Sequence, residues 1–179
     1  MSSSVGGPMS DYLSFHWVTI LIAALFALVL AGVGGALTQI GPWYRSLQFP
    51  SWKPPNWSFG PIWMVILMLG STSAVLAWAG TTSGSQRTGL VGLFVINGVL
   101  NVLWNLLFFT LRRPDWALVE TVFPWLSVLA LMAVIWPISA TASLLLAPYL
   151  NWVAIAGVLN RAIVRLNEPF AGRTETGTI

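Results

Sequence analysis

The chain has 179 residues, of which 56% are hydrophobic and only 7% are charged, and its formal net charge is +3. Soluble domains carry about 25% charged residues, so this composition excludes an ordinary soluble fold and predicts an integral membrane protein. The chain contains no cysteine and a single histidine, His16, which excludes a disulfide framework, a cysteine nucleophile and, in practice, a zinc site. The small excess of positive charge does not indicate nucleic-acid binding.

The predicted elements begin with a tail at residues 1–16, which is rich in Ser and Gly, lacks a cleavable signal and is expected to be disordered. Five apolar segments follow, each close to the ~20 residues that a helix needs to cross a hydrocarbon layer of ~30 Å. They span residues 17–38, 59–80, 89–110, 116–137 and 142–164. The sequence therefore predicts an all-α membrane protein with a single bundle of five transmembrane helices over residues 17–166, followed by a tail over residues 167–179.

The basic residues divide unevenly between the two ends of these spans. Seven of the eight Lys and Arg residues fall in the first loop, the third loop and the C-terminal end, whereas Arg87 is alone on the other side. Cytoplasmic loops of membrane proteins carry an excess of Lys and Arg. We therefore expect a multi-pass protein with its N-terminus outside and its C-terminus in the cytoplasm.

In the first span, small residues recur every four positions, at Ala23, Ala27, Ala31 and Gly35. Such a stripe lets another backbone approach closely. We interpret it as contact with a neighbouring helix of the same bundle; a dimer face is the alternative.

The first loop, residues 39–58, carries the segment WYRSLQFPSWKPP at residues 43–55. Its prolines fix φ and remove backbone donors, which favours a compact ordered loop over a continued helix. Its aromatic rings favour a lid packed over the bundle, with anchoring at the membrane interface as the alternative. The residues assigned to the lid are Trp43, Tyr44, Arg45, Pro50, Trp52, Lys53, Pro54 and Pro55.

Tryptophans also occur deep inside the spans, where a belt of interfacial aromatics does not explain them. These are Trp63, Trp104, Trp125 and Trp152. They either fill the interior of the bundle or form the walls of a ligand cavity, because a flat indole ring can stack on a planar ligand.

Amides accompany these rings in the third span. Asn97, Asn101 and Asn105 recur at i, i+4 and i+8, so they share one helix face with Trp104 nearby. They either form hydrogen bonds between helices or present polar groups to a cavity. In the fifth span Trp152, Ala156, Leu159 and Asn160 form a similar face. Two such stripes facing each other make a pocket the leading hypothesis.

Glu120 is the one carboxylate well inside a span. An intramembrane acid is a functional candidate by default. However, it follows Trp116 by about one helical turn, so we expect it to form an ion pair with Arg112 or Arg113 at the basic end. The predicted spans offer no second acid and no histidine with which Glu120 could make an acid–base pair.

With these motifs in view, the sequence resembles the translocator protein family, also called tryptophan-rich sensory proteins or peripheral benzodiazepine receptors. The resemblance rests on the first-loop segment at 43–55, FGPIW at 59–63, the series from Asn101 to Phe109, WALVE at 116–120 and APYLNW at 147–152. It implies a five-helix bundle, often a homodimer, whose pocket opens under the first loop and binds protoporphyrin, haem, sterols or synthetic aromatic ligands.

The resemblance also implies which residues line the pocket. They are Phe59, Trp63, Asn101, Trp104, Trp116, Trp152, Ala156 and Leu159, to which the amide stripe adds Asn97. Arg161 stands where the sterol motif of the animal proteins has tyrosine, so a porphyrin-like ligand is favoured over cholesterol.

Three functions from different classes follow from these observations. The favoured one is a binding protein that senses, sequesters or transports tetrapyrroles or similar planar lipophilic molecules, with no required cofactor. The alternative, proposed within the family, is an enzyme that degrades protoporphyrin in light and oxygen with Trp63 and Trp152 as redox-active rings. An ion-coupled transporter would require more buried charge than this chain contains.

Overall fold

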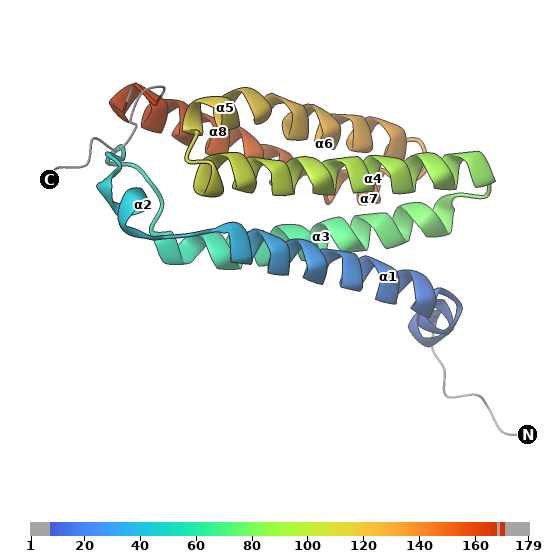
Figure 1. Ribbon diagram of the computed structural model, residues 1–179. Helices are drawn as coiled ribbons and strands as arrows, with labels where there is room; N and C mark the ends of the chain where they lie inside the picture. Colours follow the sequence, from blue (N-terminus) through green and yellow to red (C-terminus); the bar gives the residue numbers. More distant parts are fainter. Residues whose placement is uncertain (1–7, 168, 171–179) are drawn as a thin grey trace, which may run out of the picture.

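A computed structural model describes residues 8–167 and 169–170, with side chains from Trp17 onward. It contains five helices that are long and apolar enough to cross a membrane, which confirms the predicted all-α membrane fold (Figure 1). In chain order the elements are α1 (Pro8–Leu37), α2 (Pro42–Ser46), the short 3-10 helix η1 (Asn56–Ser58), α3 (Phe59–Gly80), α4 (Gly84–Asn105), the π-helical turn η2 (Leu106–Thr110), α5 (Pro114–Glu120), α6 (Val122–Ile135), α7 (Ala140–Leu144) and α8 (Ala147–Asn167).

The spanning helices form a closed ring in which sequence neighbours are not always spatial neighbours. α1 packs on α3 and on α4, α4 packs on α6, and α5 and α6 pack on α8, while α7 and α8 return to α3. Figure 1 shows α1 and α3 running side by side, with α2 at the same end of the bundle as the end of α8. This arrangement brings the first loop over the end of the bundle that carries the C-terminal part of α8.

Two of the five spans are broken, and proline explains both breaks. Pro124 has no N–H to donate to the carbonyl of Glu120 four residues earlier, and the helix is interrupted at Thr121 between α5 and α6. Pro148 stands in the same relation to Leu144, where α7 ends. Each of these spans is therefore made of two shorter helices.

The third span ends in a π-helical turn. In η2 the backbone N–H of Leu111 donates to the carbonyl of Leu106, five residues earlier, at 2.9 Å. A π-helical turn inserts an extra residue and rotates the side chains around it, and such turns are frequent at functional sites. Here it alters the direction of Phe108 and Phe109 at the lid end of the bundle.

The observed boundaries differ from the predicted ones in three places. The first helix begins at Pro8, so residues 8–16 of the predicted disordered tail are helical, and Pro8 is well suited to the first helical position. The third span begins at Gly84 rather than at residue 89. The lid is not only loop, because it contains α2 and η1. The predicted C-terminal tail, with Arg173, lies almost entirely outside the described residues.

Candidate functional site

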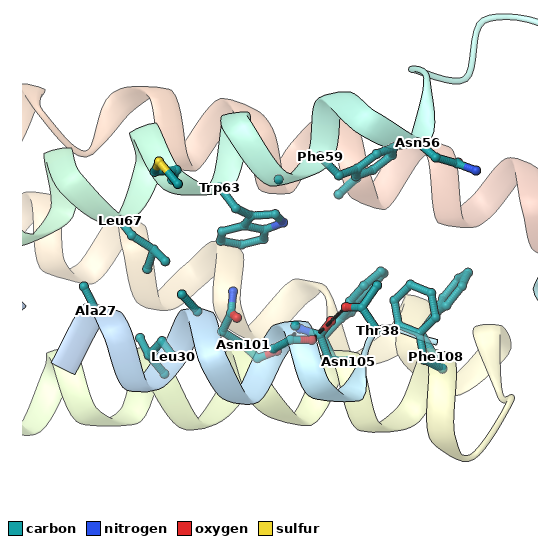
Figure 2. A pocket seen from close by; sticks show the side chains of 18 of the residues that line it. Ala27, Leu30, Thr38, Asn56, Phe59, Trp63, Leu67, Asn101, Asn105 and Phe108 are labelled. Atoms are coloured by element: carbon teal, nitrogen blue, oxygen red, sulfur yellow. Dashed lines mark hydrogen bonds between the residues drawn. The ribbon is translucent and has the colours of Figure 1, made fainter. Parts of the chain in front are cut away.

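A cavity of about 870 Å³ lies between α1, α3, α4 and α8, beneath the lid (Figure 2). Among the residues that line it are Ala27, Ala31, Gly35 and Thr38 of α1; Tyr44 and Asn56 of the lid; Phe59, Trp63 and Leu67 of α3; Asn101, Trp104 and Asn105 of α4; Phe108 and Phe109 of η2; and Ala156 and Leu159 of α8. A volume of this size fits a drug-sized ligand.

Small residues of α1 account for much of the hollow. The stripe was interpreted as a close helix contact, and α1 does approach α3 near Ala23, whose carbonyl accepts a hydrogen bond from Ser71 at 3.3 Å. Further along, however, Ala27, Ala31 and Gly35 line the cavity, and a Cβ added to Gly35 would meet no atom within 4 Å. The stripe therefore leaves space open along most of its length.

The opposite walls are aromatic. Figure 2 shows the indole of Trp63 projecting from α3 into the space opposite Asn101. Trp104 stacks on Phe108 with ring centroids 5.0 Å apart and an angle of 19° between the rings. Trp63 meets the ring of Tyr149 edge-on at 5.8 Å. The cavity thus has flat apolar surfaces on which a planar ligand can stack.

The three amides of α4 divide between the two roles considered for them. Asn97 is buried and donates to the Oγ of Ser127 at 2.7 Å, while its Oδ1 accepts from the hydroxyl of Tyr149 at 3.1 Å. Asn101 donates to that same hydroxyl at 3.4 Å. Asn97 therefore joins helices, whereas Asn101 and Asn105 reach the first cavity. Asn97 lines only a second, smaller cavity.

A pair of partly buried hydrogen bonds fastens the lid to the bundle. The backbone N–H of Gln48 donates to Oδ1 of Asn167 at 2.8 Å, and Nδ2 of Asn167 donates back to the carbonyl of Gln48 at 2.8 Å. Beside it, Tyr44 and Leu47 are buried. Burial raises the pKa of the Tyr44 phenol, so it stays neutral at ordinary pH. These contacts hold the predicted lid in a closed position over the cavity.

The lid also brings a cation to the cavity rim. The ammonium of Lys53 lies 4.7 Å from the centre of the Phe49 ring and donates to Oδ1 of Asn56, which also accepts from the hydroxyl of Tyr44 at 3.2 Å. Partial burial lowers the pKa of Lys53. Since Asn56 and Tyr44 line the cavity, the charge of Lys53 lies directly behind its wall.

The other lid residues lie around this centre. Trp43 contacts Phe108 edge-on at 6.1 Å, and the carbonyl of Pro50 accepts from the Lys53 N–H at 3.0 Å. The side chains of Trp52 and Arg45 are exposed. Pro54 is partly buried and Pro55 exposed where the lid leads into η1. Of the eight residues predicted for the lid, Tyr44 is the one whose side chain reaches the cavity.

Besides Asn97, two predicted pocket residues lie away from the first cavity. Trp116 is 60% exposed at the start of α5, where the guanidinium of Arg113 stacks on it at 5.5 Å, so it belongs to the interfacial aromatics. Trp152 is buried, but it packs behind Phe59 with ring centroids 5.6 Å apart. Phe59 lines the cavity and Trp152 does not, and the other predicted residues that line it are Trp63, Asn101, Trp104, Ala156 and Leu159.

The expected ion pair of Glu120 is not formed. Arg113 instead pairs with Asp115, with 2.9 Å between Nε and Oδ1. The carboxylate of Glu120 is 4% exposed, and neither of its oxygens has a hydrogen-bond partner in the described part of the chain. Arg113 pairs with Asp115 because Asp115 lies two residues away at the start of the same helix, whereas the Glu120 side chain faces the packed interior of the bundle. The prediction of an ion pair was therefore wrong.

Some site residues were not selected from the sequence. Tyr149 links Asn97 and Asn101; it belongs to the APYLNW motif at 147–152, but nothing in that motif assigned it a role in the site. The pair Phe108 and Phe109 reaches the cavity because of a π-helical turn, which no residue pattern signals. Asn167 closes the lid, and a lone amide at the end of an apolar span was the only available hint.

The fold and the site together define a multi-pass helical membrane protein with an intramembrane cavity under a lid. Comparison with known families identifies the protein more narrowly than the fold does, because residues 19–166 match the TspO/MBR family. The chain belongs to the TspO/MBR family. This confirms the resemblance found from the motifs.

Curated relatives cover most of the chain. It is 35% identical to Protein CrtK of Rhodobacter capsulatus over 84% of this chain and 94% of that protein. It is 36% identical to Tryptophan-rich protein TspO of Chlorobaculum tepidum over 83% of this chain and 97% of that protein. The pig Translocator protein, from Sus scrofa, is 38% identical over 70% of this chain and 75% of its own length.

Proposed function

We propose that this protein binds a tetrapyrrole such as protoporphyrin or haem, or a similarly planar lipophilic molecule, in the cavity under the lid. The observation that carries the proposal is the pairing of a large apolar cavity walled by Trp63, Trp104 and Phe108 with amide groups from Asn101 and Asn105. A flat macrocycle stacks on the rings, while the amides meet its polar atoms.

The charge at the rim favours a ligand that bears carboxylates. Lys53 is bonded to Asn56 at the edge of the cavity, and Arg45 is exposed on the same lid. Ionised propionate groups of a tetrapyrrole form charge-assisted hydrogen bonds with such cations. An uncharged sterol would give these cations no anionic partner, which supports the tetrapyrrole over cholesterol.

Binding is favoured over degradation of the pigment. The enzymatic alternative uses Trp63 and Trp152 as redox-active rings, but of these two only Trp63 lines the cavity, and Trp152 packs against Phe59 of the cavity wall. A ligand in the cavity therefore contacts one of the two rings. Sensing, sequestration and transport all begin with this binding step.

The test is a titration of the purified full-length protein with protoporphyrin in detergent, followed by tryptophan quenching and by pigment absorbance in darkness and under illumination. The wild type is expected to show saturable quenching with unchanged pigment. Ala156→Phe places a ring inside the cavity and should weaken binding at least about tenfold. Ala154→Phe is the matched control, because Ala154 is exposed on the same helix and does not line the cavity.

Two results would reject the proposal. Equal quenching curves for wild type and Ala156→Phe, with both proteins folded by circular dichroism, would place the pigment outside the cavity. Light-dependent bleaching of the pigment that is lost in Trp63→Phe would instead support the degrading enzyme.

We also propose that the lid end faces the cytoplasm and that the protein forms a homodimer. The uneven distribution of basic residues supports the orientation, since Arg87 is alone at the opposite end. The family resemblance supports the dimer. Labelling of single cysteines placed at Ser46 and Ser85 from each side of sealed vesicles tests the orientation, and the chain has no native cysteine to interfere. Chemical cross-linking tests the dimer.

A further inference from the structure

A second cavity, of about 430 Å³, lies between α1, α3 and α4 and extends toward the end of the bundle opposite to the lid. It shares Ala27, Leu30 and Leu67 with the first cavity, and Figure 2 labels these three side chains at one side of that first cavity. From there it extends to Trp78 near the end of α3. The function proposed above makes no use of it.

This second cavity is open to the surroundings of the bundle. Ile22 of α1 and Val91 and Val95 of α4 line it, and these side chains are 63%, 50% and 45% exposed. All three lie within membrane-spanning helices, so the exposed rim faces hydrocarbon rather than water. The cavity is therefore a groove that opens into the bilayer.

The groove offers few polar groups to hold water. Its polar side chains are Thr19, Ser71, Trp78, Asn97, Asn101 and Tyr149. The Tyr149 hydroxyl already bonds to both amides, and the Ser71 hydroxyl donates to the carbonyl of Ala23. An ordered water needs two to four polar partners, and an apolar cavity without them stays dry. In a bilayer the groove is surrounded by lipid acyl chains, so an acyl chain is the group expected to fill it.

An arginine, Arg87, lies at the end of the groove. The Arg87 guanidinium stacks over the Trp78 ring at 4.9 Å, and its Nε donates to the carbonyl of Thr81 at 3.1 Å. No acidic residue lies within ion-pair distance of it in the part of the chain that the structure describes. The sequence contains no Asp or Glu from residue 17 to residue 114. This cation is thus fixed beside a wall residue of the groove, and within the described part of the chain no carboxylate pairs with it.

We propose that this groove binds a membrane phospholipid, with one acyl chain between α1, α3 and α4 and the phosphate on Arg87. Arginine pairs with phosphate through its forked donors, and basic groups between transmembrane helices are known sites for lipid headgroups. Trp78 holds the Arg87 guanidinium by a cation–π contact and also lines the groove proposed for the acyl chain. It therefore joins the headgroup site to the acyl-chain site. An anionic phospholipid would give the Arg87 guanidinium a charged partner in addition to its neutral contacts with Trp78 and Thr81.

Native mass spectrometry of the full-length protein tests the proposal. The protein is reconstituted into nanodiscs of equal phosphatidylglycerol and phosphatidylcholine and then released, and the retained lipids are counted and identified. The wild type should retain a phospholipid, enriched in phosphatidylglycerol. Arg87→Gln should lower retention about tenfold, the effect expected for loss of a charge-assisted contact.

A matched pair of glycines tests the acyl site. Gly70 lines the groove, and a Cβ there meets no atom within 4 Å, so Gly70→Leu can fold while its side chain occupies the groove. It should abolish retention. Gly92 has equal room for a Cβ but lines neither cavity, so Gly92→Leu should retain lipid like the wild type.

Three outcomes would overturn the proposal. The first is unchanged lipid retention in both Arg87→Gln and Gly70→Leu. The second is displacement of the lipid by soluble inorganic phosphate alone, which would show that the acyl chain contributes no binding. The third is loss of dimer mass rather than of lipid in Gly70→Leu, which would make a second copy of the chain the occupant. None of these results depends on tetrapyrrole binding at the first cavity.

Discussion

Asn167 is expected to control how often the lid opens. Asn167→Ala removes two hydrogen bonds between α8 and the lid, the pair exchanged with the backbone of Gln48 at 2.8 Å each. A neutral hydrogen bond contributes about 0.5 to 1.5 kcal/mol, so the closed lid loses about 1 to 3 kcal/mol. That change corresponds to a roughly 5- to 150-fold rise in the open population. The burial of Tyr44 and Leu47 remains, so the lid is expected to open more often without detaching.

Hydrogen–deuterium exchange of the lid amides measures this change directly. The Gln48 amide should exchange faster in Asn167→Ala by the same factor, because its N–H is the donor to Asn167. The control is Asn151→Ala, which removes an exposed amide on the same helix that bonds only to the carbonyl of Ala147. If Gln48 exchanges at the same rate in all three proteins, the lid is held by something other than Asn167, and the reasoning is refuted.

Three further substitutions test the packing of the bundle, each by thermal unfolding in detergent. A Cβ at Gly98 would lie 2.8 Å from the ring tip of Phe26, so Gly98→Leu should destabilise the docking of α1 by about 1 to 3 kcal/mol. Gly98→Ala adds only that Cβ and should cost less, and no loss in either variant would show that α1 does not pack there. The buried Asn160 amide, with its nitrogen donating at 3.1 Å and its oxygen accepting at 2.9 Å, bridges α8 to α5, and Asn160→Leu should cost about 1 to 2 kcal/mol, whereas an unchanged midpoint would argue against the bridge. Glu120→Gln should change the free energy of unfolding by less than about 1 kcal/mol, because the carboxylate has no partner in the described part of the chain. A large loss of stability would instead indicate an ion pair of Glu120 with Arg113 or Arg112.

The sequence was most informative about position along the membrane normal. The second span runs over the predicted residues, Phe59–Gly80, because its length and hydropathy follow directly from the thickness of the hydrocarbon layer. The lid was located for a similar reason, since prolines and aromatic residues concentrate between residues 43 and 55. These are properties that a chain expresses locally.

The sequence was least informative about which face of each helix looks inward. In a soluble helix the polar face marks the outside, but in a bilayer both the lipid-facing and the protein-facing positions are apolar. Trp63 and Trp152 lie at comparable depth, yet one lines the cavity and the other packs behind Phe59. Rotation about the helix axis decides between them, and that rotation is fixed by neighbouring helices.

The sequence by itself thus determined the class of the protein, the spans, the lid and the family, because composition, length and ordered motifs carry that information. Only the tertiary structure decided that Glu120 lacks a partner, that Asn167 closes the lid and that Arg87 stands beside a second cavity. Each of these depends on contacts between residues far apart in the chain or on the direction of a side chain. Such relations arise when the helices pack, because packing selects one rotation for each of them.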